Sequence, residues 1–328
     1  MYLVMSEAAA DAVDGHVDIP YEDTTGWGVD HGTPILPVLV GDEECGPFLL
    51  LSTSPPSDVP LPPGFDHGHA TDSWRISVRG TTQMGHQSYE QGQWRYQQGG
   101  LPYASDNYPW GPEGGFGLIV FADRRGFAIR PSDPEIAAEV IPVQEVTAEV
   151  LGIRLLNPLP GAPAIVTTTG EPSNAHLDGG FDRSSEWDEA APGVRMALGL
   201  IGEPTKGPVL VFLDGEPGAE LLASRRLESE TVLIPSAGTS LSGGEALTQG
   251  ELRLEELDVE HPPLVAGDDG AQIVVLFADR RALRIALDNG DLGGATAGPL
   301  SDALAALQHQ LDVREPVVAN KLPEAPVA

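Results

Sequence analysis

The sequence has little of what several protein classes need. Cysteine occurs once, at Cys45, so no disulfide can form within the chain. Only 18 lysines and arginines stand against 49 aspartates and glutamates, and the formal net charge is −31. Nucleic acids and anionic membranes are bound through basic patches, so we expect neither partner. No run approaches the roughly 18 apolar residues of a membrane span, and residues 1–15 lack a signal-peptide pattern, so we expect a cytoplasmic protein.

Glycine and proline are abundant, at 39 and 30 of 328 residues, which is typical of short strands joined by many turns. Residues 64–100 show this pattern most clearly. His67 and His69 are two residues apart, so in a strand both would point to the same face. Gly80 and Gly92 are placed as turns, because glycine tolerates a positive φ. These features predict a hairpin whose histidine-bearing face lines a ligand pocket.

The chain also repeats itself. The sequence Phe-Ala-Asp-Arg-Arg at 121–125 recurs at 277–281, and Gly80 aligns with Gly238 in the same order along the chain. We interpret the two stretches as copies of one β unit. The predicted parts are an irregular arm (1–30), a first barrel (31–130), a connector (131–192), a second, degenerate barrel (193–285), and a C-terminal helix and tail (286–328).

Only two helices are expected. One is a short helix after Asp133 in the connector, which is otherwise polar and loop-like. The other lies near the C-terminus, with Ser301 as its N-cap and Leu304, Leu307 and Leu311 on one apolar stripe.

Two tandem β units with His67-Gly68-His69 on one strand resemble a bicupin of the cupin superfamily. The resemblance implies an all-β fold of two tandem cupin-type β-barrels, or jelly rolls, with minor helices. In that family the first motif continues with a glutamate and then a glycine; here the positions hold Ser73 and Gly80. Arg95 stands where the second motif has a histidine. The chain is also similar to uncharacterised actinobacterial cupin-domain proteins with a Gly-Pro-Glu-Gly-Gly loop and an Ala-Asp-Arg-Arg-Gly strand.

The resemblance implies metal ligation by His67 and His69, with Fe, Mn, Ni or Zn as the divalent metal. Such sites need at least one further ligand. His86 is our tentative third ligand, and Glu90 and Asp72 are alternatives. The competing interpretation is a pair of hydrogen-bonded histidines without metal.

Arginine suggests a different chemistry. Guanidinium binds carboxylates in a bidentate manner, and a nearby imidazole can act as a general acid or base. We therefore predict His67, His69 and Arg75 as catalytic. Arg95 also has a structural interpretation, because Arg253 occupies its position in the second copy. The predicted substrate-binding residues are Ser73, Trp74, Trp94, Arg95, Tyr103, Tyr108 and Trp110.

The second copy lacks these groups: His67 aligns with Arg225, His69 with Leu227 and Arg75 with Leu233. We therefore place function in the first copy. The predicted function is binding and conversion of a small organic molecule that can carry a carboxylate. The alternative is a non-catalytic ligand-binding or sensory bicupin, and we also consider a homo-oligomer.

Overall fold

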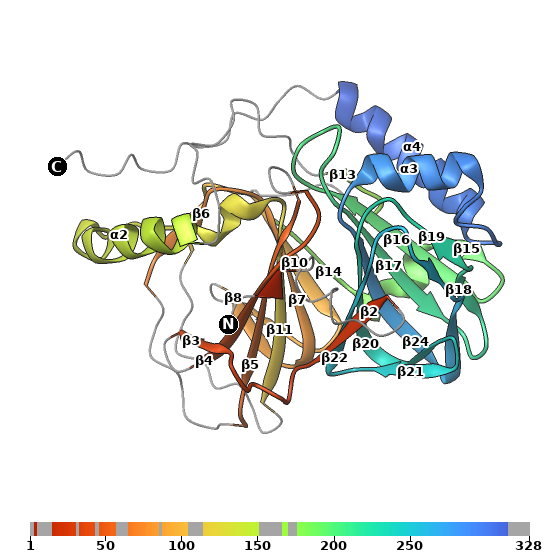
Figure 1. Cartoon of the computed structure of the whole chain (residues 1–328), viewed down its shortest axis with the longest axis horizontal. Helices are drawn as coiled ribbons and strands as arrows, with labels where there is room; N and C mark the ends of the chain where they lie inside the picture. The colour runs from red at the N-terminus through yellow and green to blue at the C-terminus, as the bar shows by residue number, and fades with distance from the viewer. Residues whose placement is uncertain are drawn as a thin grey trace.

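The computed structural model describes residues 3–4, 15–30, 33–42, 46–56, 65–84, 87–103, 114–150, 166–169 and 176–313. They form two β-rich halves that lie side by side (Figure 1). We call them the first barrel and the second barrel. No helix in these ranges is long and apolar enough to cross a membrane.

The first barrel is built on a large sheet with the strand order β1-β4-β5-β11-β7-β10-β14, and β3 pairs with β4. The bounds are β1 (Leu3–Val4), β3 (Gly28–Asp30), β4 (Thr33–Leu39), β5 (Phe48–Ser54), β7 (Ser73–Gly80), β10 (Gln93–Gln97), β11 (Gly115–Phe121) and β14 (His176–Gly180). Two small sheets pair β6 (His67–His69) with β12 (Ile129–Pro131), and β8 (Thr82–Met84) with β9 (Gln87–Tyr89).

The second barrel has the strand order β13-β16-β17-β24-β20-β22-β2, flanked by β15, β18 and β21, and β19 pairs with β23. The bounds are β2 (His16–Pro20), β13 (Val166–Thr167), β15 (Asp188–Ala191), β16 (Val194–Leu200), β17 (Val209–Gly215), β18 (Glu220–Leu222), β19 (Arg225–Arg226), β20 (Thr231–Ser242), β21 (Glu245–Thr248), β22 (Glu251–Glu255), β23 (Glu260–His261) and β24 (Leu264–Phe277).

The two barrels share one strand plan: β4-β5-β11-β7-β10 in the first corresponds to β16-β17-β24-β20-β22 in the second. Gly80 and Gly238 mark equivalent turns, each with φ +67°, and a Cβ there would lie 1.9 and 2.2 Å from a backbone oxygen. Only glycine fits both positions. The predicted fold class, two tandem cupin-type β-barrels with few helices, is confirmed by these sheets.

Each barrel is completed by a strand that precedes the other barrel in the sequence. β2 lies ahead of the first barrel but pairs with β22, and β14 lies ahead of the second barrel but pairs with β10. Asp18 is opposite Arg253, and Asp178 is opposite Arg95. We call this arrangement the strand exchange. The expectation of irregular structure was wrong at both strands.

The large sheets pack face to face and bury a common core. Along β7, alternate residues Trp74, Ile76 and Val78 point into it, and from the second barrel Phe212 and Val274 meet them. The opposite face of β7 is therefore directed into the first barrel. The halves are joined by an apolar core as well as by the exchanged strands.

Helices lie at the outer sides of the two sheets (Figure 1). The connector helix is confirmed as α2 (Pro134–Val150), which at 17 residues is longer than the short helix expected. α4 (Ala297–Val313) buries Leu304, Leu307 and Leu311 as predicted, but it begins before Ser301, which is therefore not its N-cap.

The repeated Asp-Arg-Arg starts a helix in both barrels. Asp123 accepts from the Arg125 amide at 3_10-helix η2 (Arg124–Phe127), and Asp279 accepts from the Arg281 amide at α3 (Arg280–Asn289), a helix that was not predicted. A second short 3_10 helix, η3 (Phe181–Glu186), follows β14.

Candidate ligand site in the first barrel

Two elements carry the polar groups of the site. On β7, Ser73, Arg75 and Ser77 face away from the core shared by the barrels, since they alternate with the residues buried in it. On β6, the rings of His67 and His69 lie 5.3 Å apart at their centroids. The backbone of Tyr103 pairs with that of His67 through two hydrogen bonds, of 3.0 and 2.9 Å.

Arg75, Tyr103 and His69 form a hydrogen-bond chain whose direction follows from its ends. His69 Nδ1 lies 2.8 Å from the carbonyl oxygen of Gly126. That oxygen can only accept, so Nδ1 carries the proton and Nε2 is an acceptor. The Tyr103 hydroxyl, 3.1 Å from His69 Nε2, therefore donates to it. Arg75 Nη2 in turn donates to the Tyr103 oxygen.

His69 is held neutral by its surroundings. Burial is the main reason that the pKa of His69 lies well below its usual value, and the nearby charges of Arg75 and His67 lower it further. His67 Nδ1 is likewise bonded to a carbonyl oxygen, that of Phe65, at 2.9 Å. His67 and Tyr103 keep partial solvent exposure.

The guanidinium of Arg75 has no carboxylate partner among the described residues, and its Nε has no acceptor among them. Arg95, opposite on β10, is neutralised by Asp178 at 2.7 and 2.9 Å. Burial, then the charge of Arg95, lowers the pKa of Arg75 to about 9, so Arg75 remains a cation at neutral pH. A buried donor left without an acceptor costs about 1–3 kcal/mol, and an anionic ligand would remove that cost.

Several predicted substrate-binding residues lie elsewhere. Trp74 and Trp94 are fully buried in the core between the barrels, with ring centroids 5.5 and 5.1 Å from that of Phe212. This placement corrects the expectation that they line the same site as Arg75, because both point away from it. Ser73 is buried on the inner face of β7. His86, Tyr108 and Trp110 lie outside the described residues.

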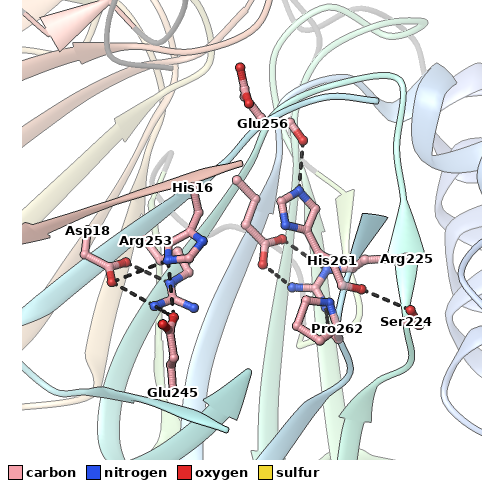
Figure 2. Close-up of polar contacts among 10 residues, drawn as sticks. His16, Asp18, Ser224, Arg225, Glu245, Arg253, Glu256, His261 and Pro262 are labelled. Atoms are coloured by element: carbon pink, nitrogen blue, oxygen red, sulfur yellow. Dashed lines mark hydrogen bonds and ion pairs between the residues drawn. The ribbon is translucent and has the colours of Figure 1, made fainter. Parts of the chain in front are cut away.

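Arg95 belongs to the strand exchange. Its bidentate pair with Asp178 repeats in the second barrel, where Arg253 binds Asp18 at 2.7 Å through both Nε and Nη2. Figure 2 shows Arg253 between Asp18 and Glu245, with His16 beside them. The same arginine–aspartate pair is present in the first barrel, which carries His67 and His69, and in the second, which has no counterpart of them. This supports the structural interpretation of Arg95.

The described residues do not fit a divalent metal. They contain no group of three or more histidine, cysteine, aspartate and glutamate side chains placed to hold one. Asp72, considered as a third ligand, instead accepts a hydrogen bond of 2.8 Å from the Gly99 amide. The Arg75 guanidinium, whose Cζ lies 4.2 Å from the Tyr103 ring centroid, would also repel a cation bound at His69.

The equivalent positions of the second barrel are filled. Arg225, at the position of His67, forms an ion pair with Glu255 that leaves their side chains 0% and 2% exposed. Arg225 Nη1 also donates to the carbonyl oxygen of Pro262, at 3.0 Å (Figure 2). Leu227 and Leu233, at the positions of His69 and Arg75, are buried. Among the described residues of the second barrel, a ligand therefore has no comparable polar group to bind.

The site and the strand plan together define an all-β protein of two cupin-type barrels, with the Arg75–Tyr103–His69 chain in the first. No family model and no curated protein matches the chain. Solved structures similar to it include oxalate decarboxylase from Bacillus subtilis, with 17% sequence identity and a TM-score of 0.43. That alignment covers 82% of this chain and 77% of the decarboxylase chain. A mutant salicylate 1,2-dioxygenase from Pseudoaminobacter salicylatoxidans has 14% identity, 74% coverage of each chain and a TM-score of 0.44. These likenesses are too distant to assign an activity, and the resemblance to actinobacterial proteins stays a prediction.

Proposed function

We propose that the first barrel binds a small organic molecule through a carboxylate and converts it by proton transfer. The observation that carries this proposal is the chain from Arg75 through Tyr103 to His69. It combines a cation that lacks a carboxylate partner among the described residues with a hydroxyl already bonded to a neutral imidazole.

Each group has a role that follows from its bonding. Arg75 would bind the carboxylate, since a guanidinium presents parallel donors to two oxygens. The Tyr103 oxygen would accept a proton from the bound molecule as its own proton moves to Nε2 of His69. The substrate is then left as an anion and His69 as an imidazolium, whose Nδ1–H still donates to the carbonyl oxygen of Gly126. Returning the proton to another atom of the substrate would complete an isomerisation.

Binding without turnover is the second candidate. It is favoured by the same chain, because every described donor and acceptor of His69 is already satisfied by Gly126 and Tyr103. A His69→Gln variant separates the two candidates. Under the catalytic proposal it keeps ligand affinity and loses turnover, whereas a binding protein shows no turnover in either form.

The experiment for the proposal is Arg75→Leu, which installs the residue found at the equivalent Leu233. Binding of benzoate, hexanoate, succinate and glycolate to the full chain is measured by isothermal titration calorimetry. Two charge-assisted hydrogen bonds at about 1.5–3 kcal/mol each predict a loss of roughly 100-fold or more in affinity.

Arg79→Leu is the matched control, because Arg79 lies on the same strand but pairs with Glu22, at 3.1 Å. The proposal predicts unchanged affinity in this control. If the Arg75→Leu chain binds as tightly as the unaltered chain, or if none of the carboxylates binds, the first barrel is not a carboxylate site.

A further inference from the structure

The inner face of the first barrel carries one row of side chains that runs from charged to apolar. The register places Arg95 opposite Arg75, Arg75 opposite Ile119, and Ile119 opposite Leu50. Residues directly opposite each other on neighbouring strands share a face of the sheet. The row therefore crosses β10, β7, β11 and β5, with two guanidinium groups at one end and two aliphatic side chains at the other.

The aliphatic end of this row keeps solvent-accessible surface. Leu50 and Ile119 are partly exposed, whereas their strand neighbours Leu49, Leu118 and Val120 are 0–1% exposed. The neighbours point into the core between the barrels, so the exposed surface of Leu50 and Ile119 belongs to the inner face. Apolar surface that stays accessible on an inward face is typical of a ligand site.

The second barrel provides an internal comparison. There the equivalent row is Arg253, Leu233, Val275 and Val211 in the same register. Leu233, Val275 and Val211 are each 0% exposed. The same register is thus closed in the second barrel, where these residues share a buried cluster with α3 and α4, and partly accessible in the first.

Tyr103 and His69, the groups proposed to transfer the proton, lie at the side of this row. The His69 ring packs on Phe121, with 4.6 Å between centroids, and Phe121 stacks on Phe48 at 5.5 Å. A carboxylate at Arg75 would place the rest of the ligand next to Tyr103 or over Ile119 and Leu50. A second charged group over these aliphatic side chains would lose water without gaining a partner, which is unfavourable.

We infer that the ligand of the first barrel is an amphiphilic monocarboxylate: its carboxylate binds Arg75 and its apolar body packs on Ile119 and Leu50. This inference rests on the proposed function and adds the substrate class. It excludes dicarboxylates and small hydroxy acids as preferred ligands, and it makes Ile119 and Leu50 specificity-determining residues.

The test compares affinities within one panel on the full chain. Benzoate and hexanoate are expected to bind at least tenfold tighter than succinate and glycolate. Ile119→Thr, which keeps a β-branched shape, is expected to reduce this preference several-fold while leaving glycolate binding unchanged. Leu50→Asn serves as a second variant if Ile119→Thr fails to fold, as judged by circular dichroism.

The outcomes separate the inference from the proposed function. If succinate or glycolate binds as tightly as hexanoate and the binding is lost in Arg75→Leu, the carboxylate site stands and the amphiphilic class is wrong. The class is also wrong if Ile119→Thr and Leu50→Asn both fold and keep the full preference. If no carboxylate binds, both the function and the class are overturned.

Discussion

The buried ion pair of the second barrel allows a quantitative test of how that barrel is filled. Arg225 Nε lies 3.1 Å from Glu255 Oε2, and both side chains are almost fully removed from solvent. Removing one partner leaves a buried charge uncompensated, which costs about 3–5 kcal/mol. We therefore expect Arg225→Met and Glu255→Leu each to lower the free energy of unfolding by that amount.

The double variant, Arg225→Met with Glu255→Leu, is expected to behave differently. Replacing a buried ion pair by apolar side chains of similar volume is often neutral, or stabilising by about 1–4 kcal/mol. The free energy of unfolding of the double variant should therefore equal or exceed that of the unaltered chain, to within roughly 1 kcal/mol. This result would imply a coupling free energy of several kcal/mol between the two positions.

Urea unfolding followed by tryptophan fluorescence measures these free energies. Trp74, Trp94 and Trp187 lie in the core between the barrels, so the signal reports on loss of that core. Carboxylate affinity should be unchanged in the folded double variant, because the Arg225–Glu255 pair lies in the second barrel. Additive losses in the double variant, or single variants as stable as the unaltered chain, would refute the reasoning.

Three further predictions concern the first barrel and its comparison with the second. Burial raises the pKa of Asp72 to about 7, so its contribution to stability is full below pH ~4 and is lost as pH rises through 7. In Asp72→Asn, the urea concentration at the unfolding midpoint should fall less between pH 4 and pH 8 than in the unaltered chain. An equal fall in both would contradict the raised pKa of Asp72. Leu227→Ala should lower stability by roughly 2–5 kcal/mol and spare ligand affinity, whereas His69→Ala should lower the melting temperature little and abolish turnover; the reverse pattern would place the site elsewhere. Dialysis against EDTA should leave carboxylate affinity unchanged, and a loss restored by Zn²⁺ or Mn²⁺ would show that a metal is required.

The duplication made most of the fold predictable. Repeated apolar strands and turn glycines such as Gly80 and Gly238 need the same backbone geometry wherever they occur, so their order along the chain indicates two copies of one barrel. The contrast between the copies also pointed to His69 and Arg75, because residues required only for folding are expected in both.

The misassigned residues have a common physical cause. Strand alternation separates Trp74 from Arg75, but it does not say which face meets the other barrel and which faces inward. Tyr103 was predicted only as a pocket aromatic, since no spacing connects it to Arg75. The strand exchange had a signal: His-Val-Asp at 16–18 matches His-Leu-Asp at 176–178, but so short a match is recognisable only once each Asp is seen opposite an arginine.

The strand exchange also imposes an order on synthesis. Asp18 and Arg253 are 235 residues apart in the sequence, so β2 leaves the ribosome long before β22 exists. At 5–20 residues per second the delay is about 10 to 50 s. During that time the first barrel can form its own sheet, and β14 can join it after a separation of only 83 residues from Arg95. β2 must wait as a nascent edge strand with unpaired backbone groups, and the acidic composition of the chain helps to keep such a segment from pairing with other chains.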